Sequence, residues 1–372
     1  MEHAVFQKLR TAMAEDGFDA LVAHSLDNVT YTAGFQVPSQ AMNRFRRTIT
    51  ILADKTFARQ IVVNVEEALA HEKSRFSNIR SYNQFTDHPS DLIADALTEA
   101  GVAAGRIAIE LDYLPAMDFL RLQEKLPNAT FVHARDLYFR TRMVKTDEEV
   151  ELLREIGALT EQVMADVVDQ LKVGMSEQTV GSAIMNRMLD VGADGVAYQV
   201  GSGARSGIIN CKPTPKIIEA DDVVRVEILG DMGGYRSNVT RTMVMGRPTD
   251  EQKQIWSVLI AARDACEAKL RPGQTVPDLW ETYRSYCTGH GIQPSLTFLG
   301  HGIGRTIHEE PYLTETREIV LQPNVTHTME PLYMVPGRMG FHVEDMYRIT
   351  ETGFEKITGL TFPNDSLIEV AA

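Results

Sequence analysis

The pattern of hydrophobic and polar positions along the first 140 residues alternates between helical and strand periodicity. Apolar side chains that recur every three or four residues predict three helices, at 6–17, 91–101 and 115–127. Short runs that are apolar on at least one face predict five strands, at 19–25, 46–54, 59–65, 106–112 and 129–134. Such alternation is typical of a sheet enclosed by helices. We therefore expect residues 1–140 to form an α/β domain.

A second domain is expected to begin at Thr146. Thr146 and Glu149 form the sequence pattern of a capping box, and apolar residues follow them at helical spacing. Ser176 and Thr249 are expected to begin two more helices. Strand patterns account for much of the rest, with a hairpin over 223–246 and further strands over 324–335 and 340–350. This mixture predicts an α+β unit over residues 146–372.

Composition narrows the classes of partner. The 372 residues carry 37 Lys+Arg against 51 Asp+Glu, a formal net charge of −14, which argues against nucleic acid or an anionic membrane as the partner. The three cysteines are too few and too scattered for a disulfide framework. The first residues lack the apolar core of a signal peptide, and no apolar run approaches the length of a membrane span. We expect a cytoplasmic protein that binds a small molecule.

Two histidines and two glutamates are the first candidates for chemistry. His301 lies among glycines in Gly-His-Gly-Ile-Gly, and His308 follows in His-Glu-Glu-Pro. Glu330 and Glu344 lie in strand patterns beside apolar residues, where an isolated charge is costly unless it is paired or coordinated. Each residue alone could be an ordinary core or surface group, but the four together predict a catalytic or metal-binding site.

The motifs HGIG, HEEP, MEP and VED, in this order after a hairpin with GGYRSNVTRT, resemble the creatinase/prolidase/aminopeptidase P superfamily. The segments DALVAHSLDNVTYTAGF and RTRMVKTDEEVELLR are similar to the same family, so the resemblance covers nearly the whole chain. It implies an N-terminal creatinase/prolidase-type α/β domain over 1–140. It also implies a C-terminal pita-bread catalytic domain over 146–372, whose curved sheet carries the site.

The resemblance is incomplete at the metal ligands. Metallopeptidases of this superfamily bind two divalent ions through two Asp, one His and two Glu. His301, Glu330 and Glu344 match three of these ligands, whereas Glu227 and Asn238 stand at the two Asp positions. Asn offers one neutral oxygen, and a Glu carboxylate reaches ~1.5 Å farther than that of Asp. We expect no full dinuclear centre and no required cofactor. The alternative is one divalent metal such as Mn or Zn, bound by Glu227, His301, Glu330 and Glu344.

Another departure from the peptidase pattern concerns substrate binding. Asn210 stands where the peptidases carry a His in a Pro-His-x-x-Pro-Thr segment. Asn210, Asn238 and His342 are predicted to contact substrate, with a turn-capping role as the alternative for Asn210. These departures favour the branch that contains creatinase and ectoine hydrolase.

The main prediction is a hydrolase that cleaves a C–N bond of a small, zwitterionic nitrogen compound without a full dinuclear centre. In this reading Glu227 attacks the substrate or activates water, and His301 or His308 moves the proton. Glu330 and Glu344 would hold a cationic group. One alternative is a metal-dependent Xaa-Pro dipeptidase or aminopeptidase with altered ligands. Another is an inactive pita-bread protein that acts as a binding module.

A basic loop interrupts the acidic chain at Arg44, Arg46 and Arg47. Creatinase-like enzymes are dimers in which an N-terminal-domain Arg reaches the partner's site and binds a carboxylate. Arg46 lies in the matching stretch, and its guanidinium suits bidentate binding. We expect a homodimer in which Arg46 reaches the partner's site, with a solvated loop as the alternative.

Overall fold

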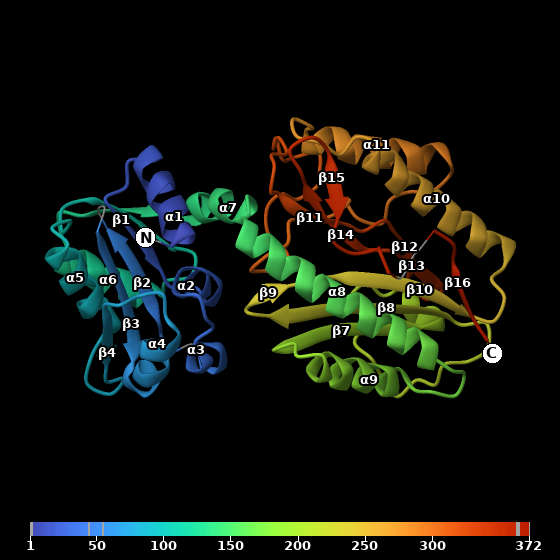
Figure 1. Ribbon diagram of the computed structural model, residues 1–372, viewed down its shortest axis with the longest axis horizontal. Helices are drawn as coiled ribbons and strands as arrows, with labels where there is room; N and C mark the ends of the chain where they lie inside the picture. The colour runs from blue at the N-terminus through green and yellow to red at the C-terminus, as the bar shows by residue number, and fades with distance from the viewer. Residues whose placement is uncertain (1–2, 44, 54–55, 362–364, 372) are drawn as a thin grey trace. The chain divides into compact units, whose positions relative to one another are not determined.

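The computed structural model describes residues 3–43, 45–53, 56–361 and 365–371. The chain divides into two units, Met1–Arg142 and Met143–Ala372, each with its own sheets and cores (Figure 1). Among the described residues, no helix combines the length and the apolar character that crossing a membrane requires.

The first unit is built on a mixed sheet in the order β4-β3-β2-β1-β5-β6. Its strands are β1 (Ala20–Ala23), β2 (Ile49–Ala53), β3 (Phe57–Val63), β4 (Ile79–Tyr82), β5 (Arg106–Ile109) and β6 (Thr130–His133). Its helices are α1 (Ala4–Glu15), α2 (Leu26–Ala33), α3 (Pro38–Met42), α4 (Glu67–Lys73), α5 (Pro89–Glu99), α6 (Ala116–Lys125) and α7 (Arg135–Met143), with a short η1 (Asn64–Glu66). Each of the eight elements predicted for this part of the sequence is present, and the shorter helices and β4 were not predicted.

Both faces of this sheet are buried, which explains why its strands are apolar without alternation. Ala20 and Val22 of β1 face one core with α5, whereas Leu21 and Ala23 face another with α1. Successive side chains of a strand point to opposite faces, so four consecutive apolar residues serve two cores.

The second unit contains a curved sheet in the order β16-β10-β8-β7, to which β9 is added beside β8. Its strands are β7 (Gly195–Ser202), β8 (Val223–Met232), β9 (Tyr235–Arg236), β10 (Val239–Met245) and β16 (Ile368–Val370). Smaller sheets contain β11 (Thr326–Met329), β12 (Leu332–Val335), β13 (Met339–His342), β14 (Asp345–Ile349) and β15 (Phe354–Lys356). The helices are α8 (Asp147–Gln170), α9 (Glu177–Asp190), α10 (Asp250–Glu267) and α11 (Val276–Gly289), with a short η2 (Gly203–Gly207).

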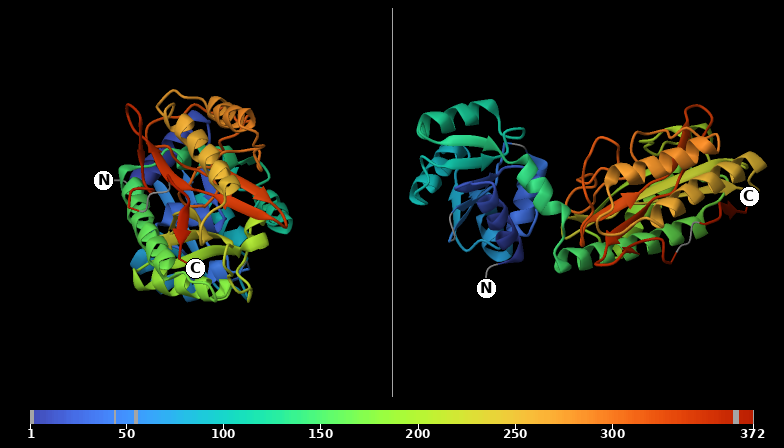
Figure 2. Two further views of the ribbon diagram at one scale, coloured as in Figure 1. Left: turned by 90° about the vertical axis from the view of Figure 1, so that its right-hand side faces the viewer. Right: turned by 90° about the horizontal axis from the view of Figure 1, so that it is seen from above.

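The four helices of this unit lie on two sides of its strands. Helices α8 and α9 pack with β7, β8 and β10, whereas α10 and α11 pack with the strands that follow them (Figures 1 and 2). The capping box that opens α8 is formed as predicted, since Thr146 Oγ1 accepts from the Glu149 N–H and Thr146 N–H donates to Glu149 Oε2. This arrangement confirms the predicted fold class, an α/β domain followed by a pita-bread α+β unit.

The hairpin of β8 and β10 separates an apolar face from a charged face. Val224, Val226 and Ile228 of β8 point into the core shared with α8 and α9. Arg225 and Glu227 alternate with them and therefore point to the opposite face. The register pairs Glu227 with Thr240 of β10 and with Gln199 of β7.

Each of the two strands predicted near the C-terminus is broken in the middle. The segment 324–335 forms β11 and β12 with Glu330 between them, and 340–350 forms β13 and β14 with Glu344 between them. Pro331 has no N–H for a ladder hydrogen bond, which accounts for the first break. Both glutamates therefore lie at strand ends rather than within strands.

Candidate functional site

A buried cluster in the second unit joins His301 to Glu330 and Glu344. One ligand atom of each residue lies within 4.8 Å of the others. His301 Nε2 is 3.5 Å from Glu330 Oε1 and 3.6 Å from Glu344 Oε1. The three residues come from the loop after α11, the end of β11 and the start of β14. The fold therefore brings together three predicted site residues that are separated by up to 43 positions in the sequence.

The tautomer of His301 follows from its surroundings. Its Nδ1 is 3.0 Å from the carbonyl oxygen of Gly302, which can only accept, so Nδ1 carries the hydrogen. Burial lowers the pKa of His301 to about 4, so the ring is neutral at pH 7. Its Nε2 has no hydrogen-bond partner, and a lone pair there faces the two carboxylates. This is the arrangement of a histidine that binds a metal through Nε2.

His342 has the opposite tautomer. Its Nδ1 lies 3.4 Å from Nη1 of Arg225, which can only donate, so Nδ1 accepts and the hydrogen is on Nε2. That Nε2 is 3.4 Å from Glu330 Oε2 and 3.7 Å from Glu344 Oε2. His342 thus turns a hydrogen, not a lone pair, toward the carboxylates, and its Nε2 makes no hydrogen bond to a described residue.

Glu344 is held in place from the neighbouring strand. Asn238 Nδ2 donates to its Oε1 at 2.9 Å, and Thr240 Oγ1 donates to its Oε2 at 3.1 Å. Thr240 and Glu344 also exchange backbone hydrogen bonds at 3.2 Å. Each oxygen of this carboxylate therefore accepts at least one hydrogen bond, and Thr328 also hydrogen-bonds to this group.

Three carboxyl groups crowd this site. Burial and the charge of Glu344 raise the pKa of Glu227 to about 8, and burial raises that of Glu344 to about 8. Burial and the two neighbouring carboxylates raise the pKa of Glu330 well above its usual range. Like charges that are buried together call for a cation to balance them.

The residues present fit one divalent cation. His301 Nε2 and Glu330 Oε1 are buried atoms without hydrogen-bond partners, and both are aimed at the same space as Glu344 Oε1. Imidazole nitrogen and carboxylate oxygen are ligands that Zn²⁺ and Mn²⁺ accept. Among the described residues, Glu227 does not join this ligand group, although the sequence predicted that it would.

Two of the predicted residues lie at the margin of the cluster. The His308 ring stacks on that of His301 with centroids 3.7 Å apart, and the residue remains exposed. Partial desolvation and the proximity of His301 lower the pKa of His308 to about 4. Asn210 is also exposed, and its Oδ1 accepts from Gln199 Nε2 at 3.3 Å. Since Gln199 lies opposite Glu227 in the sheet, Asn210 is tied to the strand beside the cluster.

Sequence reasoning missed Arg225 and Gln199. Both point to the face of the sheet that carries Glu227, the first from two positions earlier in β8 and the second from the paired strand. The period of two along a strand puts Arg225 on the same face as Glu227. No sequence motif marks an arginine in an apolar strand as part of a site.

The basic loop belongs to the first unit. Arg46 Nε donates to Gln84 Oε1 at 3.0 Å, and Arg47 pairs with Asp118. Arg44 lies outside the described residues. The interactions recorded for Arg46 are internal to this unit, and its predicted reach into a partner's site stays a prediction.

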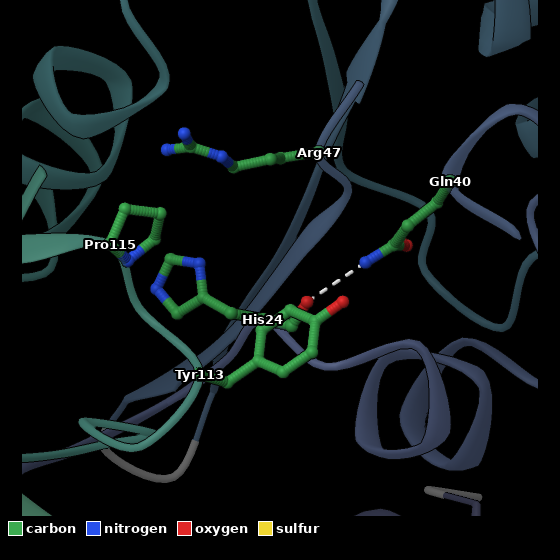
Figure 3. A pocket seen from close by; sticks show the side chains of 5 residues that line it. All are labelled: His24, Gln40, Arg47, Tyr113 and Pro115. Atoms are coloured by element: carbon green, nitrogen blue, oxygen red, sulfur yellow. Dashed lines mark hydrogen bonds between the residues drawn. The ribbon is translucent and has the colours of Figure 1, made fainter. Parts of the chain in front are cut away.

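A cavity of about 240 Å³ lies beside this loop, lined by His24, Gln40, Arg47, Tyr113 and Pro115 (Figure 3). Gln40 Nε2 donates to the carbonyl oxygen of His24 at 2.8 Å, which fixes the amide at the wall of the cavity. Burial, with the nearby Arg47, lowers the pKa of His24 to about 3, so the ring is neutral. The cavity is thus lined by one cationic and several neutral groups.

Comparison with known proteins follows the two units. Residues 151–351 match the family model described as metallopeptidase family M24, and residues 6–144 match the creatinase/prolidase N-terminal domain. The probable dipeptidase PepE of Mycobacterium tuberculosis is 33% identical over 270 residues, which cover 72% of this chain and 71% of PepE. The Xaa-Pro dipeptidase of Lactobacillus helveticus is 28% identical and covers 80% of this chain and 81% of its own. The crystal structure of an X-Pro aminopeptidase from Thermotoga maritima superposes with a TM-score of 0.86 at 25% identity, covering 98% of this chain and 99% of the other.

These matches correct two predictions. The main prediction, a creatinase-like hydrolase of small nitrogen compounds, was wrong, because relatives over most of the chain are named dipeptidases or an X-Pro aminopeptidase. The expectation that no cofactor is required was also wrong, because the matching family is one of metallopeptidases. Both predictions relied on the replaced positions, Glu227, Asn238 and Asn210. The other three residues, His301, Glu330 and Glu344, form a cluster with the ligand types of a metal site.

Proposed function

The chain belongs to metallopeptidase family M24 and is a hydrolase of C–N bonds, and from this premise we propose a specific activity. The protein is a metal-dependent dipeptidase that acts on Xaa-Pro dipeptides. The observation that carries this proposal is the buried ligand cluster of His301, Glu330 and Glu344. The names of its relatives supply the substrate class.

His301, Glu330 and Glu344 are the residues that would hold the metal. A divalent cation in such a site polarises a peptide carbonyl and lowers the pKa of a bound water. Asn238 and Thr240 hold the carboxylate of Glu344 through their hydrogen bonds, so this ligand is oriented before any ion binds. His342 Nε2 lies 3.4 Å from Glu330 Oε2, so its hydrogen faces that carboxylate.

His308 and Glu227 are the groups that we assign to proton handling. His308 is exposed, neutral at pH 7 and stacked on a metal-binding ring, so it can accept a hydrogen bond from a substrate near the metal. Glu227 lies 3.5 Å from Arg225 and, because burial raises its pKa to about 8, can hold a proton there. Asn210 and Gln199 offer amide groups to the substrate backbone.

The proposal extends to assembly and location. We assign residues 1–140 and 146–372 to separate domains, and we propose a cytoplasmic homodimer in which Arg46 binds the carboxylate of a substrate in the partner's site. An arginine-rich loop in a chain of net charge −14 supports the assignment of Arg46. Three free, buried cysteines are compatible with a reducing compartment.

Hydrolysis of dipeptides before and after chelation tests the proposal. Purified protein loaded with Mn²⁺ should hydrolyse an Xaa-Pro dipeptide faster than a matched Xaa-Ala dipeptide and should leave creatine intact. Dialysis against EDTA should lower the rate at least tenfold, and added Mn²⁺ should restore it. Equal rates with and without chelation would overturn the metal requirement. A metal-loaded protein inert toward every dipeptide would favour the inactive binding module.

A further inference from the structure

A fully buried arginine faces the metal-binding cluster. Arg225 is 1% exposed and lies on the same face of β8 as Glu227. Its Nη2 donates to the carbonyl oxygens of Ile208 and Ile209, which anchors the guanidinium from behind. Its Nη1 lies 3.5 Å from Glu227 Oε2. Because a guanidinium is always protonated in proteins, a permanent positive charge is built into this site.

The other buried cations nearby are already matched by partners of their own. Arg241 lies 2.7 Å from Asp345 and 3.6 Å from Glu161, on the side of the sheet that α8 covers. Lys145 lies 2.6 Å from Glu309. Among the described residues with recorded ion pairs, Arg225 is the cation that faces Glu227.

The two positions that depart from the family pattern each interact with another group of the site. Asn238 turns its amide nitrogen toward Glu344, so it acts as a hydrogen-bond donor to a carboxylate. Glu227 turns Oε2 toward Arg225 and stands outside the ligand group of His301, Glu330 and Glu344. The carboxylate oxygens that would hold a second ion are therefore missing at one position and paired with a guanidinium at the other.

We propose that this centre holds a single divalent cation and that the guanidinium of Arg225 supplies the positive charge of the second ion. The proposal rests on the metal-dependent function proposed above. Charge balance supports it, because Glu227, Glu330 and Glu344 carry three negative charges when ionised. One divalent cation and one guanidinium neutralise them, whereas a second divalent cation would leave an excess of positive charge.

The unaltered protein gives the first test. After removal of metal, titration with Mn²⁺ followed by elemental analysis should saturate at one ion per chain. Its electron paramagnetic resonance spectrum should show the hyperfine pattern of an isolated ion, not the exchange-coupled spectrum of an ion pair. Two tightly bound, coupled ions per chain would overturn this inference and leave the proposed function standing. A protein that binds no Mn²⁺ would overturn both.

A variant that removes the guanidinium and introduces both Asp ligands gives the second test. Arg225→Met combined with Glu227→Asp and Asn238→Asp removes the guanidinium and places a carboxylate at each replaced ligand position. This variant should bind a second Mn²⁺ at least tenfold more tightly than the unaltered protein does, because a like charge has been removed and an opposite one added. The matched control, Arg225→Lys with the same two Asp substitutions, retains a cation and should bind one ion. If the Met variant keeps the circular dichroism and cooperative melting of the parent but binds only one ion, the inference fails.

Discussion

At the scale of single residues, the chemistry of the centre depends on which nitrogen of each histidine carries the hydrogen. The carbonyl of Gly302 fixes the hydrogen of His301 on Nδ1, and the guanidinium of Arg225 fixes that of His342 on Nε2. Two histidines that face the same carboxylates thus present different groups to them, His301 a lone pair and His342 a hydrogen. This difference comes from their neighbours, because neither sequence motif specifies a tautomer.

Replacement of His301 by Ala should weaken Mn²⁺ binding at least tenfold, because it removes the nitrogen ligand and leaves two carboxylates. Isothermal titration calorimetry of the metal-free protein measures this loss. His290→Ala is the matched control, since His290 is exposed and stacks on Tyr286. Equal affinities for the two variants would remove His301 from the metal site.

At the scale of elements, much of the architecture follows from local patterns. Capping residues predicted the starts of α8, α9 and α10, and apolar periodicity predicted the β8–β10 hairpin. The breaks at Glu330 and Glu344 were not predicted, because apolar residues on both sides of Pro331 indicate one continuous strand and the second break depends on tertiary pairing. Arg225 was missed for a related reason, since its burial is explained only by partners distant in the sequence.

The start of α8 makes a quantitative prediction. Thr146→Ala removes the side chain that accepts from the Glu149 N–H and should lower the free energy of unfolding by about 1 kcal/mol. Thr146→Ser keeps the hydroxyl and should lose less than half as much. Urea unfolding followed by circular dichroism distinguishes them. A Thr146→Ala protein as stable as the parent would show that the cap contributes nothing.

At the scale of the whole molecule, the sequence predicted two units and an acidic chain, and the family resemblance covered both units. Function was harder to predict, because the ligand set mixes retained residues with replaced ones. His301, Glu330 and Glu344 match the ligands of the metallopeptidases, whereas Glu227 and Asn238 stand at the two Asp positions. The replaced ligands argued against a metallopeptidase. The geometry of the three matching residues and the family match both favour a metallopeptidase.

The buried groups make the stability of the metal-free protein depend on pH. Glu227 and Glu344, with pKa values raised to about 8, favour the folded state at low pH, and this contribution is lost as pH rises from about 4.5 to 8. His301, His308 and His327, with pKa values lowered to about 4, favour it above pH 6.5, and that contribution is lost as pH falls to 4. Between about pH 6.5 and 8 the contribution of the histidines to stability is constant, and only that of the carboxyl groups changes.

The melting temperature of the metal-free protein should therefore fall as pH rises from about 6.5 to 8, as measured by differential scanning calorimetry. Excess Mn²⁺ should reverse the trend, because an ion bound to the folded state favours the ionised carboxylates. Glu344→Gln cannot ionise at this position and should show a shallower slope without metal. A melting temperature of the metal-free parent that stays constant over this range would contradict the assignment.

We propose that His301, Glu330 and Glu344 bind a divalent metal. Anomalous diffraction from crystals of the Mn²⁺-loaded protein, collected at the manganese edge, tests it most directly. We predict one strong anomalous peak per chain, within about 2.5 Å of His301 Nε2 and of a carboxylate oxygen from each glutamate. If no peak lies at these residues, because the metal binds elsewhere or not at all, they are not the metal ligands.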